Sequence, residues 1–191
     1  MSEVTASQLQ DRSSNIILNN TNGILQVVQS VKTGHQAISG GSAPEYGVAL
    51  VTDMEVTITK TSPRSKILVI VDMRVAGTSS YNRQEWILMR DGEPCFIGQG
   101  QNQLDYQNSA GTNNCTGRMP VNSDQPATSM CSTGCWFLDH DSEELQSTMT
   151  YSVFAGDRNG DSTVYINRSR AGTTASNQTI CASSITAIEV A

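Results

Sequence analysis

A strict two-residue alternation of apolar and polar side chains is the feature that most constrains the fold. Residues 54–60 read Met-Glu-Val-Thr-Ile-Thr-Lys, so the first three odd places in the segment are apolar and the places between them are polar. This period is that of a β-strand with one face in a core and the other in solvent. Further short apolar or alternating segments occur at 24–31, 66–75, 84–90, 95–97, 135–138, 148–154, 163–168 and 185–190. The sequence therefore predicts an all-β protein, and no segment predicts a helix of ordinary length.

Turn residues separate these segments at short intervals. Asp91-Gly92 and Asn159-Gly160 are dipeptides that suit tight hairpins. Residues 33–47 and 99–129 are predicted to be loops, because they combine glycine and polar residues without a period. Many short strands joined by turns are typical of an antiparallel β-sandwich of jelly-roll type, which we assign to residues 23–191.

Two of the predicted strands also indicate what surrounds them. Residues 66–75 begin as a continuous apolar run, which predicts a central strand covered on both faces at its start. In the strand 24–31, the apolar residues Leu25, Val27 and Val31 share one face. The first of these strands therefore requires a cover on each side of its sheet.

The first 22 residues differ from the rest of the chain because they are mostly polar and end in Asn-Asn-Thr-Asn. Their main apolar group is the trio Ile16, Ile17 and Leu18. We expect residues 1–22 to form a short extended N-terminal arm that becomes ordered against something else. The apolar trio is then the contact that the arm uses for docking or assembly.

Charge and hydropathy exclude several classes of protein. The net charge is −6, so we expect no nucleic-acid partner, because no basic stripe is present to neutralise phosphates. No apolar run approaches the ~20 residues of a membrane-spanning helix, and the first residues lack the basic-then-apolar order of a signal peptide. We therefore expect synthesis in a cytosol and no membrane insertion.

The sequence contains 5 cysteines, an odd number that argues against a complete disulfide framework within one chain. Cys131 and Cys135 are separated by three residues, one more than in the usual zinc-binding pair, and a zinc site would need to add Cys115 or His140. A disulfide from Cys115 to Cys131 or Cys135 could form after release into an oxidising medium. Buried, chemically inert thiols are the third interpretation, and the sequence does not choose among the three.

No catalytic or metal-binding motif is complete. Asp157, Asn159 and Asp161 alternate as in a calcium loop, but the later glycine and glutamate of such a loop are missing, so a plain hairpin turn is favoured. The acidic segment 139–144, which includes His140, could hold paired carboxylates, but a solvated loop is the simpler interpretation. No Gly-x-Ser-x-Gly nucleophile motif occurs. We therefore predict no enzyme activity, no metal and no cofactor.

Aromatic residues are the candidates for ligand contact, because sugars bind on aromatic faces with polar groups around the rim. Tyr81 and Tyr106 fall in polar segments and are the predicted ligand-binding residues. Trp86 and Trp136 fall in predicted strands, where a large aromatic side chain is expected to lie in the core.

A set of segments also resembles a known family. The stretches GILQVVQSVKT, VTITKTSPRSKILVIVDM, MTYSVFAG, VYINRSRAG and ASSITAIEVA occur in this order across residues 23–191. They resemble the small β-sandwich at the C-termini of tail-fibre and virion-associated proteins of marine and cyanobacterial tailed phages. The resemblance implies a virion structural protein, made in the host cytoplasm, that forms a homotrimer and has other virion proteins of the capsid or tail as partners.

Three functions are compatible with this resemblance. The first is a tail-fibre or receptor-binding knob that contacts host surface polysaccharide. The second is a capsid decoration, or cement, protein that stabilises the head through its arm and needs no host ligand. The third is a free carbohydrate-binding module. A chain of 191 residues has little room for a fibre shaft, so a knob would have to be attached to another fibre protein.

Overall fold

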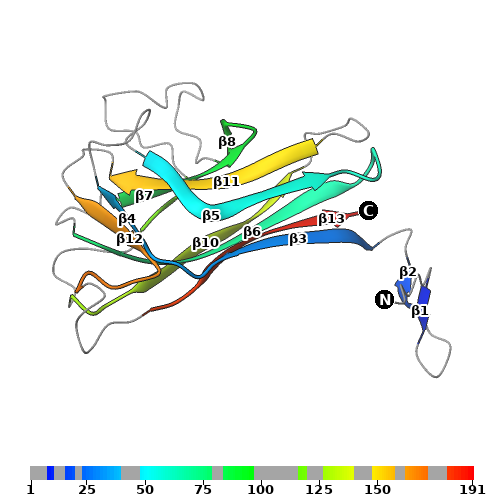
Figure 1. The fold of residues 1–191 in the computed structure, drawn as a ribbon. Helices are drawn as coiled ribbons and strands as arrows, with labels where there is room; N and C mark the ends of the chain where they lie inside the picture. Colours follow the sequence, from blue (N-terminus) through cyan, green and yellow to red (C-terminus); the bar gives the residue numbers. More distant parts are fainter. Residues whose placement is uncertain are drawn as a thin grey trace.

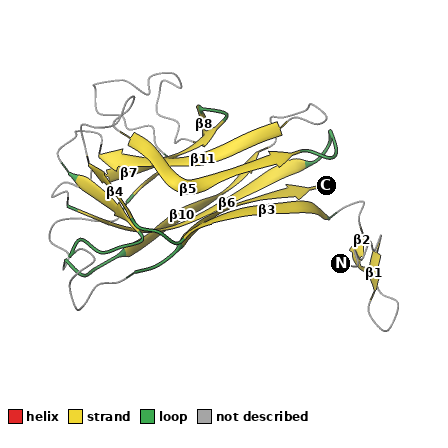
Figure 2. Cartoon of the chain, viewed as in Figure 1, coloured by secondary structure: helices red, strands yellow, loops and turns green. Residues whose placement is uncertain are grey.

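The computed structural model describes residues 8–10, 16–19, 23–39, 48–78, 84–96, 116–119, 127–139, 148–157, 162–171 and 180–191. Every regular element in these ranges is a β-strand, as Figure 2 shows. The strands are β1 (Gln8–Gln10), β2 (Ile16–Asn19), β3 (Ile24–Lys32), β4 (Gln36–Ser39), β5 (Val48–Thr59), β6 (Lys66–Gly77), β7 (Gln84–Arg90), β8 (Glu93–Phe96), β9 (Gly117–Arg118), β10 (Cys131–Asp139), β11 (Thr148–Asp157), β12 (Thr163–Ile166) and β13 (Ser183–Val190). The prediction of an all-β protein is confirmed.

The first sheet is built around β6 (Figure 1). One edge of β6 pairs with β10 along residues 67–75, and the opposite edge pairs with β13 along residues 66–72. Further along that second edge, residues 75–77 of β6 pair with β12. Next to β13 lies β3, and next to β12 lies β4. The sequence correctly places 66–75 in a central strand.

The second sheet packs over the inner face of the first (Figure 1). Its strands follow the order β5–β11–β7–β8, and β9 also pairs with β7. All pairings between described strands are antiparallel. The predicted antiparallel β-sandwich is therefore confirmed, and its jelly-roll type stays a prediction.

The core lies between the two sheets and consists of their inward-facing side chains. Met54, Val56 and Ile58 are buried there, as their alternation with polar residues predicts. The first sheet contributes mainly β-branched residues from β6, and the second contributes larger ones from β7 and β11. The buried core residues of the two sheets include Val69, Val71, Met73, Val75, Trp86, Leu88, Tyr151, Val153, Ile185 and Ala187. Close packing of this apolar surface stabilises the sandwich.

Two of the predicted loops contain short strands. β4 lies within 33–47 and pairs with β12, and β9 lies within 99–129 and pairs with β7. Such strands gain their backbone hydrogen bonds from a neighbour distant in sequence, which a local pattern does not reveal. In β4, only Ile38 is buried, so the segment is too short to show a period.

The N-terminal segment contains a paired structure instead of a single extended arm. β1 and β2 form a two-stranded antiparallel sheet of their own, in which Leu9 lies opposite Leu18. Ile16, Ile17 and Leu18 all belong to β2. Figure 1 draws this pair outside the two packed sheets. Pairing satisfies backbone groups that an isolated extended segment would leave to water, and the role of the trio in assembly stays a prediction.

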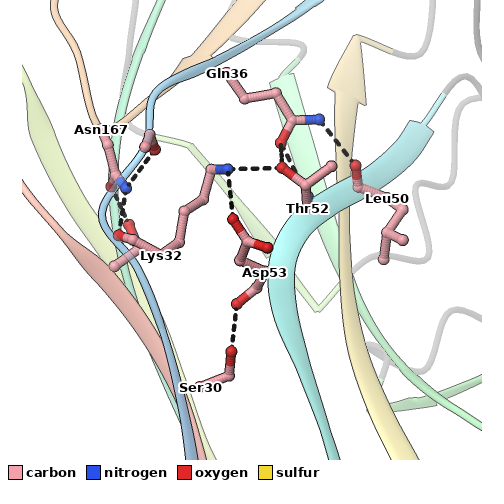
Figure 3. Close-up of polar contacts among 9 residues, drawn as sticks. Ser30, Lys32, Gln36, Leu50, Thr52, Asp53 and Asn167 are labelled. Atoms are coloured by element: carbon pink, nitrogen blue, oxygen red, sulfur yellow. Dashed lines mark hydrogen bonds and ion pairs between the residues drawn. The ribbon is translucent and has the colours of Figure 1, made fainter.

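The face of β3 that carries Val27 and Val31 points away from the core. These two side chains are 55% and 49% exposed, whereas Lys32 on the opposite face is buried. Lys32 Nζ donates to Thr52 Oγ1 at 2.7 Å and lies 4.0 Å from the Asp53 carboxylate of β5 (Figure 3). The inner side of β3 thus closes a polar seam between the sheets, and this seam determines which face of the strand turns inward.

Candidate interaction face

An apolar row crosses the outer face of the first sheet. Ile188 of β13 lies opposite Val27 of β3 on one side and opposite Leu68 of β6 on the other. Leu68 in turn lies opposite Leu138 of β10. Directly opposed residues in a sheet have Cβ atoms about 4.5–5.5 Å apart, so the four side chains form one continuous row.

Neighbouring rows extend this surface in both directions. On one side, Val190 lies opposite Ile24, which is 53% exposed. On the other side, Ile70 lies opposite Trp136, whose side chain is 75% exposed. We call the resulting surface the apolar face; its residues are Ile24, Val27, Leu68, Ile70, Trp136, Leu138, Ile188 and Val190.

The apolar face is contiguous, whereas exposed apolar residues on most soluble proteins are scattered. Large exposed apolar patches mark surfaces that contact a protein, a membrane or a ligand. The continuous apolar run at the start of β6 predicts a cover on both sides of the sheet. The core covers one side, and the described residues of this chain leave Leu68 and Ile70 only partly covered on the other.

A hollow lies beside the apolar face, between β6 and β10. Its volume is about 470 Å³, and it opens broadly to solvent. The lining residues are Ile70, Val71, Asp72, Ser132, Thr133, Gly134, Cys135 and Trp136. A Cβ atom at position 134 would lie 2.0 Å from the Val71 carbonyl oxygen, so only glycine fits there. Backbone atoms of Gly134 and Val71 therefore form the floor of the hollow, and the side chain of Trp136 forms one wall.

Asp72, the charged residue that lines this hollow, belongs to an ion pair. Arg74 Nη1 donates to Asp72 Oδ1, and both residues belong to β6. The Asp72 side chain is 52% exposed and the Arg74 side chain 32%. A carboxylate has about four lone-pair sites, so Asp72 keeps the capacity to accept hydrogen bonds from a bound molecule.

Asp139, at the start of the acidic segment, is a structural carboxylate. Arg90 Nη1 donates to its two oxygens at 2.8 and 2.7 Å, and Tyr151 Oη donates to Oδ2 at 2.6 Å. Burial and this hydrogen bond raise the pKa of Tyr151 well above its ordinary value. Asp139 therefore ties β10 to β7 and β11 in the interior, while His140 and residues 141–144 lie outside the described residues.

Among the three interpretations of the cysteines, inert thiols agree best with the cysteines that the structure describes. Cys95, Cys131 and Cys135 pack against the core. Burial raises the pKa of Cys95 to about 12 and that of Cys135 to about 12, so neither is a thiolate at neutral pH. Cys115, which the zinc and disulfide interpretations need, lies outside the described residues. No group of three metal-binding side chains occurs within the described ranges.

The hairpin favoured for the segment that begins at Asp157 is wrong, because the strands on its two sides lie in different sheets: β11 pairs with β5 and β7, whereas β12 pairs with β4 and β6. Asp157 is buried at the end of β11, and Ser162 Oγ donates to its Oδ2 atom. This hydrogen bond spans the connection from β11 to β12. Asn159 and Asp161, the other two residues of the calcium-loop pattern, lie outside the described residues.

The two tryptophans have opposite environments. Trp86 is 1% exposed, as predicted, and its Nε1 donates to Thr133 Oγ1 at 3.1 Å. The prediction that Trp136 lies in the core is wrong, because Cys135 and Phe137 occupy the inward positions of β10 and place Trp136 on the outer face. The predicted ligand-binding residues Tyr81 and Tyr106 lie outside the described residues. The signal for Trp136 was the pair of small residues Thr133 and Cys135, which share the inward face of β10 and leave room for Trp86 beside Thr133.

Comparison of the chain with known protein families found no match, and comparison with curated proteins found no relative. In the described ranges, no helix has the length and apolar character needed to cross a membrane.

Proposed function

We propose that this protein is a structural subunit of a tailed-phage virion, acting as a tail-fibre or receptor-binding knob that presents its sandwich to host surface glycans. The observation that carries the proposal is the apolar face. A surface of this kind fits a protein whose role is to contact other molecules within a larger assembly. The resemblance of residues 23–191 to virion proteins is our reason for proposing that this assembly is a virion.

Self-association of three copies accounts for the apolar face in this proposal. Three sandwiches around one axis can turn the β3 and β13 part of their apolar faces, with Ile24, Val27, Ile188 and Val190, inward and remove it from water, while the β10 part with Trp136 stays open at the rim. Full burial of an exposed Leu, Ile or Val side chain contributes about 1.5–3 kcal/mol, so several such side chains per subunit provide a substantial driving force. A closed trimer also presents three equal glycan-binding surfaces, which raises avidity without any additional contact.

One observation favours the second candidate function, a capsid decoration protein. The Ala191 amide donates to the Gly23 carbonyl oxygen at 2.9 Å, so the chain leaves the sandwich for β2 directly beside Ile24 and Val190. The N-terminal segment and the apolar face therefore start at the same end of the sandwich. An arm rooted there can clamp a neighbouring capsid subunit while the apolar face contacts it.

Antibody labelling of purified tailed particles that contain this protein tests the proposal and separates the two candidates. Label at the tail is the result expected for a fibre or knob, and label over the head supports the decoration protein. Absence of the protein from particles, measured by mass spectrometry of gradient-purified virions, contradicts both.

A variant that lacks residues 2–22 tests the contribution of the N-terminal segment. Because these residues precede the sandwich, the truncated protein is expected to fold and to give the circular dichroism spectrum of the full chain. We expect it to be missing from particles. Incorporation at the level of the full chain would show that the segment has no part in assembly.

A further inference from the structure

We propose that the hollow beside Trp136 is a binding subsite for a neutral pyranose sugar. This inference rests on the proposed glycan-contacting function and names the surface and the class of sugar. The predicted ligand contacts at Tyr81 and Tyr106 lie outside the described residues and stay predictions; the site proposed here is on the first sheet and is composed of Trp136, Asp72, Ser132 and Gly134, with Arg74 paired to Asp72.

The aromatic wall of the hollow is the first argument. Trp136 is 75% exposed, so most of its indole is accessible from solvent. A pyranose ring has an apolar side formed by its C–H groups, and this side can stack on an aromatic ring while the hydroxyls stay at the rim. Trp86 satisfies its Nε1 and lies inside the core, so burial of a large aromatic in this sandwich is possible. The exposure of Trp136 is thus a specific property of its position.

The polar rim is the second argument. Small-ligand sites combine apolar contact with a few polar groups that orient the ligand. Here Asp72 can accept hydrogen bonds from sugar hydroxyls, and Arg74 holds its carboxylate in place through the bond to Oδ1. Ser132, exposed on β10 directly opposite Arg74, adds a hydroxyl that both donates and accepts.

The rigidity of the support is the third argument. β6 and β10 pair without a register shift from Cys131 to Asp139. On the other edge of β6, the Arg74 amide donates to Ser183 Oγ at 3.0 Å and the Arg74 carbonyl accepts from the Asn167 amide at 2.8 Å. The rim is therefore organised before a ligand arrives, which reduces the entropy lost on binding.

Charge selects among sugars. Asp72 places a carboxylate at the rim, its Arg74 partner is already engaged, and the chain as a whole has a net charge of −6. A uronic acid or sialic acid in the hollow would bring a second carboxylate close to Asp72. Like charges at short range repel, so the site favours neutral hexopyranosides.

Tryptophan fluorescence tests this site directly, because the two tryptophans differ so strongly in exposure. Acrylamide quenches exposed tryptophan, so quenching of the full-length protein reports mainly on Trp136, and Trp86 serves as an internal reference. The probes are methyl α-glucoside, methyl α-mannoside and methyl β-galactoside, with galacturonic acid as the anionic comparison. We expect at least one neutral glycoside to protect Trp136 from acrylamide and galacturonic acid to give no protection.

Variants define the residues responsible, with binding to the protecting glycoside measured by calorimetry. Trp136→Ala is expected to weaken binding by about tenfold, through loss of the aromatic contact, and Trp136→Phe to retain part of the affinity. Asp72→Asn is expected to weaken binding and to reduce the discrimination against galacturonic acid. Leu50→Ala, an exposed apolar residue of β5 in the other sheet, is the matched control and should bind as the unchanged protein does.

The outcomes separate this inference from the proposed function. Absence of protection by every glycoside at 100 mM or below overturns the sugar subsite, as does protection that survives in Trp136→Ala. Trp136 fluorescence that is already shielded in a ligand-free oligomer also overturns it, because that result places the indole in a subunit interface. In each of these cases the association of subunits and the presence of the protein in virions can still be observed independently.

Discussion

Each side of the first sheet includes side chains whose chemistry is unusual for their position. The side and seams that face the second sheet contain the charged residues Lys32, Asp139 and Glu189, all of them buried. The side that faces away carries the apolar face. Each buried charge has hydrogen-bond or ion-pair partners within the chain, whereas the apolar face has no comparable cover among the described residues. The comparison shows that these buried charges are paired within one chain, and it supports our proposal that another molecule covers the outer face.

Glu189 is the clearest example of a completed interior. Its carboxylate accepts hydrogen bonds from Gln26 Nε2 at 2.8 Å and from the Thr61 and Ser62 amides at 2.8 and 3.2 Å. The hydroxyls of Thr61 and Ser65 add two more. This single side chain thereby fixes the β5–β6 turn against β13 and β3.

The largest expected effect is the loss of this buried carboxylate. Glu189→Ala removes the acceptor for donors in the turn 61–65 and leaves them unpaired in the interior. We expect the free energy of unfolding to fall by about 3–5 kcal/mol. Urea denaturation followed by circular dichroism measures the change, with Glu55→Ala on the exposed side of β5 as the control. A loss below about 1 kcal/mol would mean that the turn is held by other contacts.

The second prediction concerns Asp139 of β10, which joins the other edge of the first sheet to the second sheet. Asp139→Asn removes the charge that pairs with Arg90 but keeps an acceptor for Tyr151. Because the Arg90 side chain is partly exposed and can turn to water, we expect a smaller loss, about 2–3 kcal/mol. Thermal unfolding measures it. Equal stability of the variant and the unchanged protein would show that the attraction between Asp139 and Arg90 only offsets the cost of removing the two charges from water.

The third prediction is a dependence of stability on pH. Burial tends to raise the pKa of Glu189, but the hydrogen bonds from Ser65, Gln26 and Thr61 outweigh it and lower the pKa in the folded protein. The stabilisation is therefore fully present above the unfolded pKa of about 4.3 and is lost as the pH falls through the folded pKa. Glu189→Gln should flatten the decline of the urea midpoint between about pH 6 and pH 3. An unchanged slope would assign the acid sensitivity to other carboxylates.

The smallest expected effect is on the outer face. Val27→Asp places a charge where the side chain is already more than half exposed, so the stability of the isolated subunit should change by no more than about 0.5 kcal/mol. The same substitution should nevertheless abolish self-association. Leu50→Asp, on the other sheet, is the matched control for an added charge. Full self-association of the Val27→Asp variant would show that Val27 does not lie in the subunit interface.

Sequence periodicity predicts the strands better than it predicts their orientation. The alternation at Met54, Val56 and Ile58 identifies both the strand and its buried face, because the other positions are all polar. In β3, the inward position of Lys32 depends on Thr52 and Asp53 across the seam, which are contacts between strands that a local pattern does not contain. The strand β4 is missed for a similar reason, since its pairing with β12 is long-range.

The candidate site is harder to predict than the fold. Trp136 and Cys135 are adjacent in β10, and either could face the core by hydropathy alone. In the structure, Trp86 fills the interior beside Thr133, an inward residue of β10, and Cys135 and Phe137 take the next inward positions, so Trp136 faces outward. The hollow also depends on Gly134, whose requirement comes from the close approach of the Val71 carbonyl. Both features arise from packing between strands distant in sequence.

The solution mass of the purified full chain, measured by light scattering, tests most directly the proposal that another molecule covers the outer face. We predict the mass of three chains of 20.5 kDa each, falling to that of one chain in Val27→Asp while the circular dichroism spectrum stays the same. A monomer at every concentration, with the same mass for both proteins, would contradict self-association through the apolar face.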